Sequence, residues 1–241
     1  MLPPTQTSPS NSGLVHRLQD VRTAIAAAAH TAGRDERAVT LVAVSKGHQA
    51  ELISAAARLG ITDFGENYLQ EALPKIAALR EAPLVWHFLG RLQANKTRPV
   101  AEHFDWVHGL DRLRIAERLS QQRSHLAPPL NVCLQVNIAQ DDKKAGVAPA
   151  DVAPLAAAVA SLPHLRLRGL MCMLPEGLDT PARRDAYSRL RQLLVTLRTS
   201  HPELDTLSMG MSGDFSDAIL EGATMVRVGT AIFGPRDYSH I

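Results

Sequence analysis

The stretch TLVAVSKGHQ (residues 40–49) contains the unit that decides the fold, a short β-branched apolar run followed by polar residues. A continuous apolar run of this length is typical of a strand that is buried on both faces, as in a parallel sheet. The run ends in Lys46, and lysine is strongly hydrated and seldom fully buried. The pattern therefore predicts a strand end that either uses the amine or lets it reach water.

The same unit of strand and helix recurs along the chain. The strand candidates are TLVAVS (40–45), ITDFGEN (61–67), LVWHFLG (84–90), FDWVHGL (104–110), LNVCLQVNI (130–138), LRLRGLMCM (165–173), DTLSMGMS (205–212) and TMVRVGT (224–230). Helical segments join these strands. Asp111 is a candidate N-cap for the helical segment 111–123, and Pro99 is expected to break the helical segment 91–103. This alternation predicts a single (β/α)8 barrel, with an open doubly wound sheet as the alternative. An amphipathic helix precedes the first strand, so we expect one domain over residues 13–241 after a disordered lead at 1–12.

Composition excludes several classes of function. The 241 residues carry a formal net charge of only +2, without the basic cluster that nucleic-acid binding requires. The sequence has neither a secretion signal nor a stretch long enough to span a membrane. Its two cysteines, Cys133 and Cys172, lie in apolar runs and are expected to be reduced core thiols. These features predict a soluble cytoplasmic protein, and the lack of an exposed apolar stripe favours a monomer.

Lys46 lies where a barrel of this kind places its chemistry, at the C-terminal end of a strand. Alternation of side chains puts it on the same side as Val42 and Val44, so its ammonium is able to point into the barrel mouth. Desolvation there lowers the pKa of a lysine and favours the neutral amine that attacks an aldehyde. The alternative is a lysine that merely extends to water from a strand end.

The C-terminal quarter adds a candidate phosphate site. Met211 and Ser212 end one strand, and Ser212 is a candidate helix N-cap with backbone N–H groups beside it. Gly229 and Thr230 follow the last strand, where glycine allows close approach and threonine offers a hydroxyl. Loops in these two positions frequently bind phosphate in (β/α)8 enzymes. With Lys46 they describe a pocket for a phosphorylated aldehyde, although Asp214 is unfavourable there unless its carboxylate points away.

Arg227 lies inside the strand run MVRVG, where a charged group is unexpected unless it is paired or contacts a ligand. It is two residues before Gly229 and therefore on the same face of the strand. An arginine that donates to a pyridine nitrogen keeps that nitrogen unprotonated. The alternative is a structural salt bridge.

Several ordered motifs resemble one family. The runs are LVAVSK, FGENYLQEA, WHFLGRLQANK, LQVNI, LRGLMCM, LSMGMSGD and MVRVGTAIFG. Together they resemble the pyridoxal phosphate homeostasis proteins (the YggS/PROSC family) over nearly the whole chain. The resemblance implies a barrel similar to the cofactor-binding domain of alanine racemase, with pyridoxal 5′-phosphate on Lys46 as a Schiff base. It also implies Met211, Ser212, Gly229 and Thr230 around the phosphate, Arg227 near the pyridine nitrogen and Asn67 beside the ring.

Three functional hypotheses follow. The favoured one is a protein that holds pyridoxal phosphate and supplies or buffers it, with cofactor-dependent apoenzymes as partners and no committed turnover. The second is an amino-acid racemase, which needs a base on each face of the ring, yet none of the three tyrosines is a convincing second base. The third is a barrel that binds no cofactor and serves as an interaction module. Histidine and cysteine spacing predicts no metal site, and His87 is interpreted as a core or rim residue.

Overall fold

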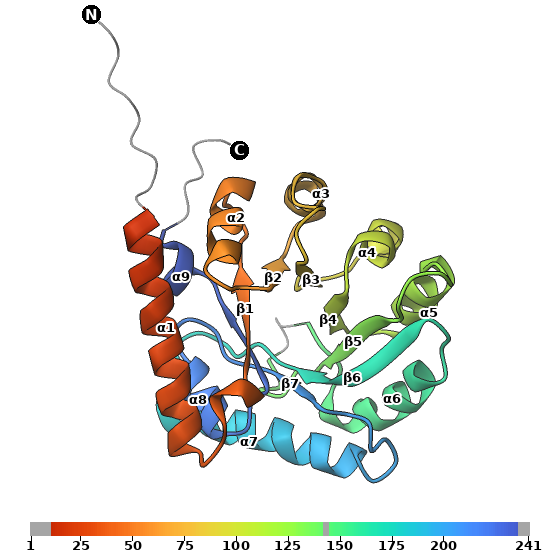
Figure 1. Cartoon of the computed structure of the whole chain (residues 1–241). Helices are drawn as coiled ribbons and strands as arrows, with labels where there is room; N and C mark the ends of the chain where they lie inside the picture. The colour runs from red at the N-terminus through yellow and green to blue at the C-terminus, as the bar shows by residue number, and fades with distance from the viewer. Residues whose placement is uncertain (1–10, 142–144, 236–241) are drawn as a thin grey trace, which may run out of the picture.

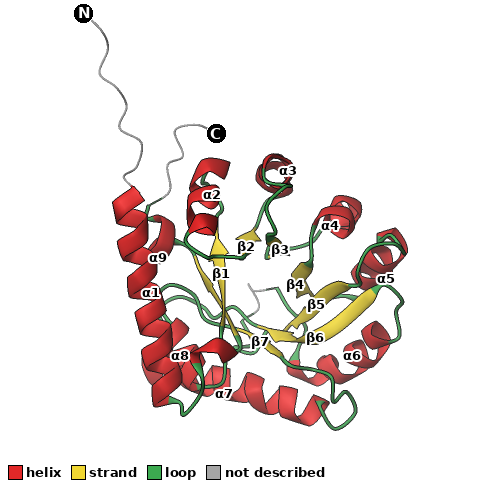
Figure 2. Cartoon of the chain, in the orientation of Figure 1, coloured by secondary structure: helices red, strands yellow, loops and turns green. Residues whose placement is uncertain are grey.

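The computed structural model describes residues 11–141 and 145–235. Within these ranges eight parallel strands close into a barrel in chain order, and the last strand pairs with the first. Helices surround the strands, as Figure 1 shows along the chain and Figure 2 by type of element. The predicted closed barrel is confirmed, and the open doubly wound sheet is wrong, because β1 and β8 are hydrogen-bonded neighbours.

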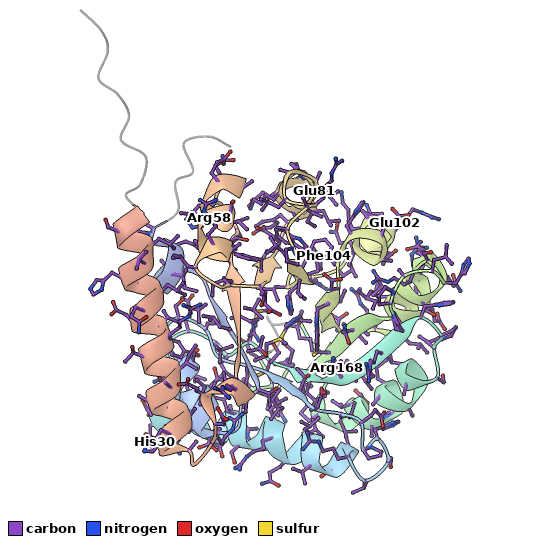
Figure 3. All side chains as sticks on the ribbon, viewed as in Figure 1. His30, Arg58, Glu81, Glu102, Phe104 and Arg168 are labelled. Atoms are coloured by element: carbon purple, nitrogen blue, oxygen red, sulfur yellow. The ribbon has the colours of Figure 1, made fainter. Side chains whose placement is uncertain are left out.

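The strands are β1 (Thr40–Val44), β2 (Asp63–Glu66), β3 (Val85–Phe88), β4 (Trp106–Leu110), β5 (Leu130–Gln135), β6 (Leu165–Met171), β7 (Thr206–Ser208) and β8 (Met225–Val228). The helices are α1 (Asn11–Thr31), α2 (Ala50–Arg58), α3 (Leu69–Ala78), α4 (Thr97–His103), α5 (Leu113–Gln122), α6 (Val152–Ala160), α7 (Thr180–Leu197), α8 (Phe215–Leu220) and α9 (Thr230–Phe233). Three short 3-10 turns are η1 (Glu36–Ala38), η2 (Ala94–Lys96) and η3 (Pro149–Asp151). Polar side chains such as His30, Arg58, Glu81 and Glu102 lie on the surrounding helices and turns in Figure 3.

The N-terminal helix α1 packs against the end of the chain. Its apolar positions, among them Leu14, Leu18 and Val21, are buried as their helical spacing predicts. Arg17 reaches across to α9, where its Nε donates to the Ile232 carbonyl at 2.7 Å. Most of the predicted disordered lead, residues 1–10, lies outside the described residues, and the helix begins at Asn11. The contacts of α1 with α8 and α9 therefore fix the last βα unit beside β1.

Two apolar clusters separate the inside of the barrel from the outside. Val42 belongs to the small inner cluster with Trp106 and Cys133, whereas Ala43 belongs to the large cluster under the helices. Alternation along β1 therefore puts Val44 and then Lys46 on the inner side of the strand end. Cys133 and Cys172 are free and buried, and burial raises the pKa of both thiols to about 12, as expected for inert core cysteines. None of the helices in the described residues is long and apolar enough to cross a membrane.

Two local predictions are wrong. Pro99 does not break its helix, because it is the third residue of α4, where the missing N–H is not needed by the helix. Asp111 does not cap α5, because that helix starts at Leu113 and its N-cap is Arg112. The Asp111 carboxylate instead accepts from Arg112 Nε at 2.8 Å.

Candidate functional site

The loop that carries Lys46 is anchored on both sides of the lysine. Ser45 N–H donates to the Gly65 carbonyl of β2 at 3.0 Å, and Gly47 N–H donates to Glu71 Oε2 at 2.7 Å. Gly47 has φ of +75°, a conformation that favours glycine. The His48 ring lies against Phe233 of α9, with the ring centroids 5.2 Å apart. Lys46 is half-buried between these anchors, so the backbone that presents its amine is held at the barrel mouth.

A buried ion pair lies beneath this loop. Lys75 Nζ donates to Glu66 Oε1 at 2.8 Å and to the Ser45 carbonyl at 3.0 Å, and Ser45 Oγ donates to the same Glu66 oxygen at 2.6 Å. Burial raises the pKa of Glu66, and the charge of Lys75 only partly offsets that effect. Sequence reasoning missed this pair. The available signals were a glutamate at the end of an apolar strand and the scarcity of lysine in the chain.

The turn after β7 differs from its prediction. Ser212 is not a helix cap, because α8 begins three residues later at Phe215. The Ser212 hydroxyl instead accepts a weak hydrogen bond from Gly229 N–H at 3.3 Å, which joins the loops after β7 and β8. Among the described residues the backbone N–H groups of Ser212 and Gly213 have no acceptor. They remain available to an anion, while Met211, at the start of the turn, is 36% exposed.

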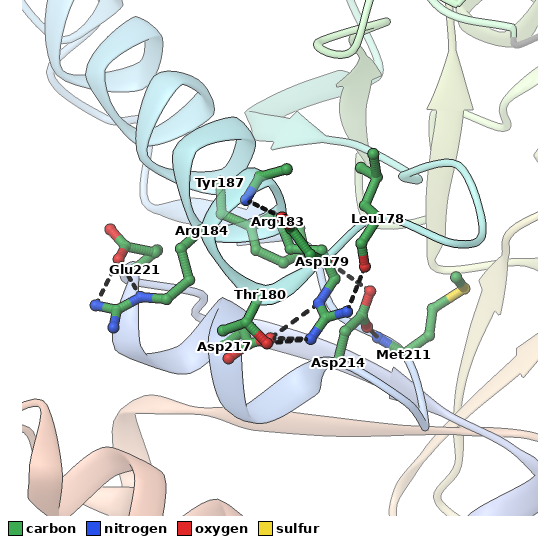
Figure 4. Close-up of polar contacts among 11 residues, drawn as sticks. Leu178, Asp179, Thr180, Arg183, Arg184, Tyr187, Met211, Asp214, Asp217 and Glu221 are labelled. Atoms are coloured by element: carbon green, nitrogen blue, oxygen red, sulfur yellow. Dashed lines mark hydrogen bonds and ion pairs between the residues drawn. The ribbon is translucent and has the colours of Figure 1, made fainter.

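Asp214 is held by the protein itself (Figure 4). Its Oδ1 accepts from Met211 N–H at 2.6 Å, and its Oδ2 accepts from the Tyr187 hydroxyl of α7 at 2.8 Å. Arg183 binds the neighbouring Asp217 through Nη2 at 2.8 Å. Both oxygens of the Asp214 carboxylate therefore accept hydrogen bonds from the protein and support the 211–214 turn.

The last strand brings its end against the first. A Cβ added at Gly229 meets the Val44 carbonyl oxygen at 3.1 Å, so the glycine allows the two strand ends to approach closely. Thr230 follows at the start of α9 and is exposed, with its hydroxyl and backbone N–H without a partner among the described residues. Gly229 and Thr230 therefore lie beside the strand that leads to Lys46, as the barrel predicts.

Arg227 is buried inside the barrel and is only 4% exposed. Its Nη1 donates to Ser208 Oγ at 2.6 Å, and its Nη2 donates to the Cys172 carbonyl at 2.9 Å. Burial lowers the pKa of the guanidinium, and its hydrogen-bond partners among the described residues are a hydroxyl and a carbonyl, not a carboxylate. The salt-bridge alternative is therefore wrong for the part of the chain that is described. The two hydrogen bonds use two of five N–H donors and leave the others for a ligand.

Asn67 directly follows β2 and is half-buried. Its carbonyl lies so close to Gly90 that a side chain at position 90 has no room, so the loops after β2 and β3 are in contact. Asn67 is thus at the barrel mouth, where the end of β1 lies between it and Thr230, which follows β8. The residues predicted for the site all follow or end strands at this one end of the barrel, except Arg227, which lies within β8.

The chain matches the family model described as the alanine racemase N-terminal domain over residues 17–237. A pyridoxal phosphate homeostasis protein of Pseudomonas aeruginosa is 54% identical over 227 residues, which cover 94% of this chain and 97% of that protein. The chain belongs to the pyridoxal phosphate homeostasis family. An Escherichia coli protein of the same name is 50% identical over 236 residues and covers 94% of this chain and 98% of its own length. The family predicted from the motifs is confirmed.

Solved structures agree with this membership. PipY of Synechococcus elongatus, solved with pyridoxal phosphate bound, is 38% identical and superposes with a TM-score of 0.80 over 92% of this chain and 100% of that chain. An alanine racemase of Clostridium difficile has a TM-score of 0.71 over 95% of this chain and 58% of its own, at 12% identity. At that identity the racemase shares the barrel fold with this family member, and the likeness shows no more than that.

Proposed function

We propose that this member of the family binds pyridoxal 5′-phosphate covalently through Lys46, holds it, and supplies or buffers it for the cell. The observation that carries the proposal is the placement of Lys46 and the Gly229–Thr230 turn at hydrogen-bonded neighbouring strands, with Arg227 on the second of them. That a relative 38% identical was solved with this cofactor bound supports it. Met211, Ser212, Gly229 and Thr230 surround the phosphate in this proposal, and Asn67 lines the ring.

The residues at the mouth fit such a group. The N–H groups of Ser212, Gly213 and Thr230 have no acceptor among the described residues, and paired strand-end loops of this kind suit a phosphate. The buried Arg227 guanidinium, which pairs with no carboxylate in residues 11–141 and 145–235, suits an unprotonated ring nitrogen, because arginine donates hydrogen bonds and accepts none. When bound, the cofactor supplies an aldehyde that reacts reversibly with a lysine amine. The loop anchored at Ser45 and Gly47 holds that amine at the mouth.

Borohydride reduction of the protein after incubation with pyridoxal phosphate tests the covalent site. We expect a visible absorption band that disappears on reduction, with the added mass on the peptide that contains Lys46. Lys96 is the matched control, because it lies in a 3-10 turn away from β1 and is not expected to carry the mass. A protein that stays colourless and unmodified contradicts the proposal, and a label confined to another lysine contradicts the assignment to Lys46.

We propose a carrier rather than a catalyst, with no catalytic residue assigned. A racemase needs a second base opposite the lysine. The Tyr187 hydroxyl donates to Asp214, and burial raises the pKa of this phenol. Tyr68 is 57% exposed beside Asn67, and Tyr238 lies outside the described residues. Exchange of the Cα proton of alanine for deuterium at useful turnover rates, lost in Lys46→Ala and reduced in Tyr68→Phe, would establish the racemase instead.

The partners in this proposal are apoenzymes that require the cofactor, and the protein acts in the cytoplasm as a monomer. The exposed large apolar side chains of the described residues are scattered over different elements, for example Val15, Leu126 and Val195, which supports a monomer. Mixing the loaded protein with an apoenzyme tests transfer, because enzyme activity then rises as the visible band of the carrier falls. Sedimentation at micromolar concentration tests the monomer. A barrel that binds no cofactor remains the outcome if no band forms.

A further inference from the structure

A chain of polar side chains crosses the interior of the barrel. It starts at Arg227, whose Nη1 lies 2.6 Å from Ser208 Oγ, and continues from Ser208 to His108 Nδ1 at 2.8 Å. His108 Nε2 lies 2.9 Å from His87 Nδ1, and His87 Nε2 lies 3.0 Å from Asp63 Oδ1. Ser208, His108 and His87 have no exposed surface. The five side chains of this row come from five different strands, β8, β7, β4, β3 and β2.

Arg227 and Asp63, the two ends of this row of side chains, fix the direction of every hydrogen bond between them. Arginine only donates hydrogen bonds, and an ionised carboxylate only accepts them. Burial by itself raises the pKa of Asp63, but the hydrogen bonds from His87 and Thr62 outweigh this and lower it, so the carboxylate is ionised at neutral pH. Starting from Arg227, Ser208 accepts and then donates to His108 Nδ1, which leaves the His108 proton on Nε2. His108 Nε2 donates to His87 Nδ1, and His87 Nε2–H donates to Asp63.

The opposite direction of the hydrogen bonds would leave a buried donor unpaired and add a buried charge. If His108 Nδ1 donates to Ser208, the serine hydroxyl proton has no acceptor among the described residues, and a buried donor without a partner costs about 1–3 kcal/mol. His87 must then be doubly protonated to face Asp63, which puts a second positive charge inside the barrel that holds Arg227. Trp106 stacks on the His87 ring at 5.5 Å between centroids with an interplanar angle of 14°, which fixes the ring in the plane that the chain needs.

We propose that Ser208, His108 and His87 are positioning residues for Arg227, joined to Asp63 by a hydrogen-bond relay of one direction in which both histidines are neutral and protonated on Nε2. The relay holds the Arg227 guanidinium at one end, where the proposed function places the ligand ring. At the other end Asp63 lines a separate hollow of about 440 Å³ beside the first residues of β1 and β2, together with Arg22, Arg37 and Thr40. The tautomer assignment does not rest on the proposed function, whereas the effect on the ligand does.

NMR of the histidine ring nitrogens in the ligand-free, 15N-labelled protein tests the direction of the relay. We expect His87 and His108 to carry a proton on Nε2 and none on Nδ1 at neutral pH. Ser208→Ala and Asp63→Asn assign the signals, because the first perturbs His108 and the second perturbs His87 most strongly. A proton on His108 Nδ1, or a doubly protonated His87, overturns the relay whatever the protein binds.

The ligand arm uses the loaded protein. Ser208→Ala removes the acceptor of Arg227 Nη1, so we expect pyridoxal phosphate to bind roughly tenfold more weakly, with a shifted visible band. Ser208→Thr keeps the hydroxyl and restores both readouts. Ser120→Ala is the matched control. Like Ser208, Ser120 is a buried serine, but its hydroxyl donates to the Pro163 carbonyl and lies outside the relay. Unchanged affinity and band in Ser208→Ala overturn the positioning role, whereas a wild-type protein that binds no cofactor contradicts the proposed function and leaves the tautomer result to decide the relay.

Discussion

Lys75 Nζ lies 2.8 Å from Glu66 Oε1, and neither side chain is more than 9% exposed. The pair lies directly under the strand end that presents Lys46, because Lys75 also donates to the Ser45 carbonyl. Glu71 extends the group from the same helix, with one oxygen 3.7 Å from Lys75 Nζ and 2.7 Å from Gly47 N–H. These charged side chains thus fix the backbone on both sides of Lys46, the residue proposed to bind the cofactor.

Lys75→Met is expected to destabilise the protein by about 3–5 kcal/mol, because it leaves the Glu66 carboxylate buried without its cation. Urea unfolding followed by circular dichroism measures the loss. The double variant Lys75→Met/Glu66→Gln is the control, since it removes the stranded charge, and we expect it to recover at least half of the loss. A single variant that loses less than about 1 kcal/mol contradicts the structural role of the pair.

Gly229→Ala is expected to weaken binding of pyridoxal phosphate by roughly tenfold or more. The added Cβ meets the Val44 carbonyl oxygen at 3.1 Å and Val44 Cβ at 3.3 Å, so the ends of β8 and β1 must move apart. Titration of the visible band measures the affinity. Gly13→Ala in α1 is the control outside the proposed site, because its added Cβ meets only the flexible end of the Arg17 side chain, and we expect wild-type affinity there.

Tyr187→Phe is expected to cost about 1–3 kcal/mol, because it removes the hydroxyl that donates to Asp214 Oδ2 and leaves that oxygen unpaired. The 211–214 turn then loses one of its two supports, so binding of the cofactor weakens as well. Thermal unfolding and the band titration measure the two effects. Tyr68→Phe removes a hydroxyl from an exposed ring and is expected to change stability by less than about 0.5 kcal/mol. Equal effects of the two substitutions contradict this role of Asp214.

The barrel was predictable because its pattern is local. Each strand is a short apolar run with a helix after it, and the ends of parallel strands meet at one mouth whatever the details of packing. That rule alone brought Lys46, Gly229 and Thr230 together from positions more than 180 residues apart. The cap assigned to Ser212 was wrong because helix start signals do not fix the first helical residue, and α8 is only six residues long.

The supporting polar groups depend on tertiary contacts that no local pattern contains. Lys75 reaches Glu66 because one face of α3 packs behind β2, and the sequence shows only a lysine four residues after Glu71. His87 of β3 pairs in register with Trp106 of β4. His108 lies two residues after Trp106 and therefore points to the same inner side of β4. Ser208, which completes that contact, is 100 residues away from His108. The interpretation of His87 as a core or rim residue is correct in that the ring is fully buried, but it did not include these hydrogen bonds.

Stability is expected to fall as the pH drops from about 7 towards about 5, in part through His108. Burial lowers the pKa of His108 well below its ordinary value, and the neighbouring His87 and Arg227 lower it further. In this range the unfolded state binds a proton at position 108 and the folded state does not, so this histidine alone removes up to about 1.4 kcal/mol for each pH unit below about 6.5. Urea unfolding across the range measures the slope. His108→Gln should flatten it by that amount whatever its stability at neutral pH, whereas His103→Gln, at an exposed position of α4, should keep the wild-type slope. An unchanged slope in His108→Gln would mean that the buried imidazole takes up its proton in the folded protein.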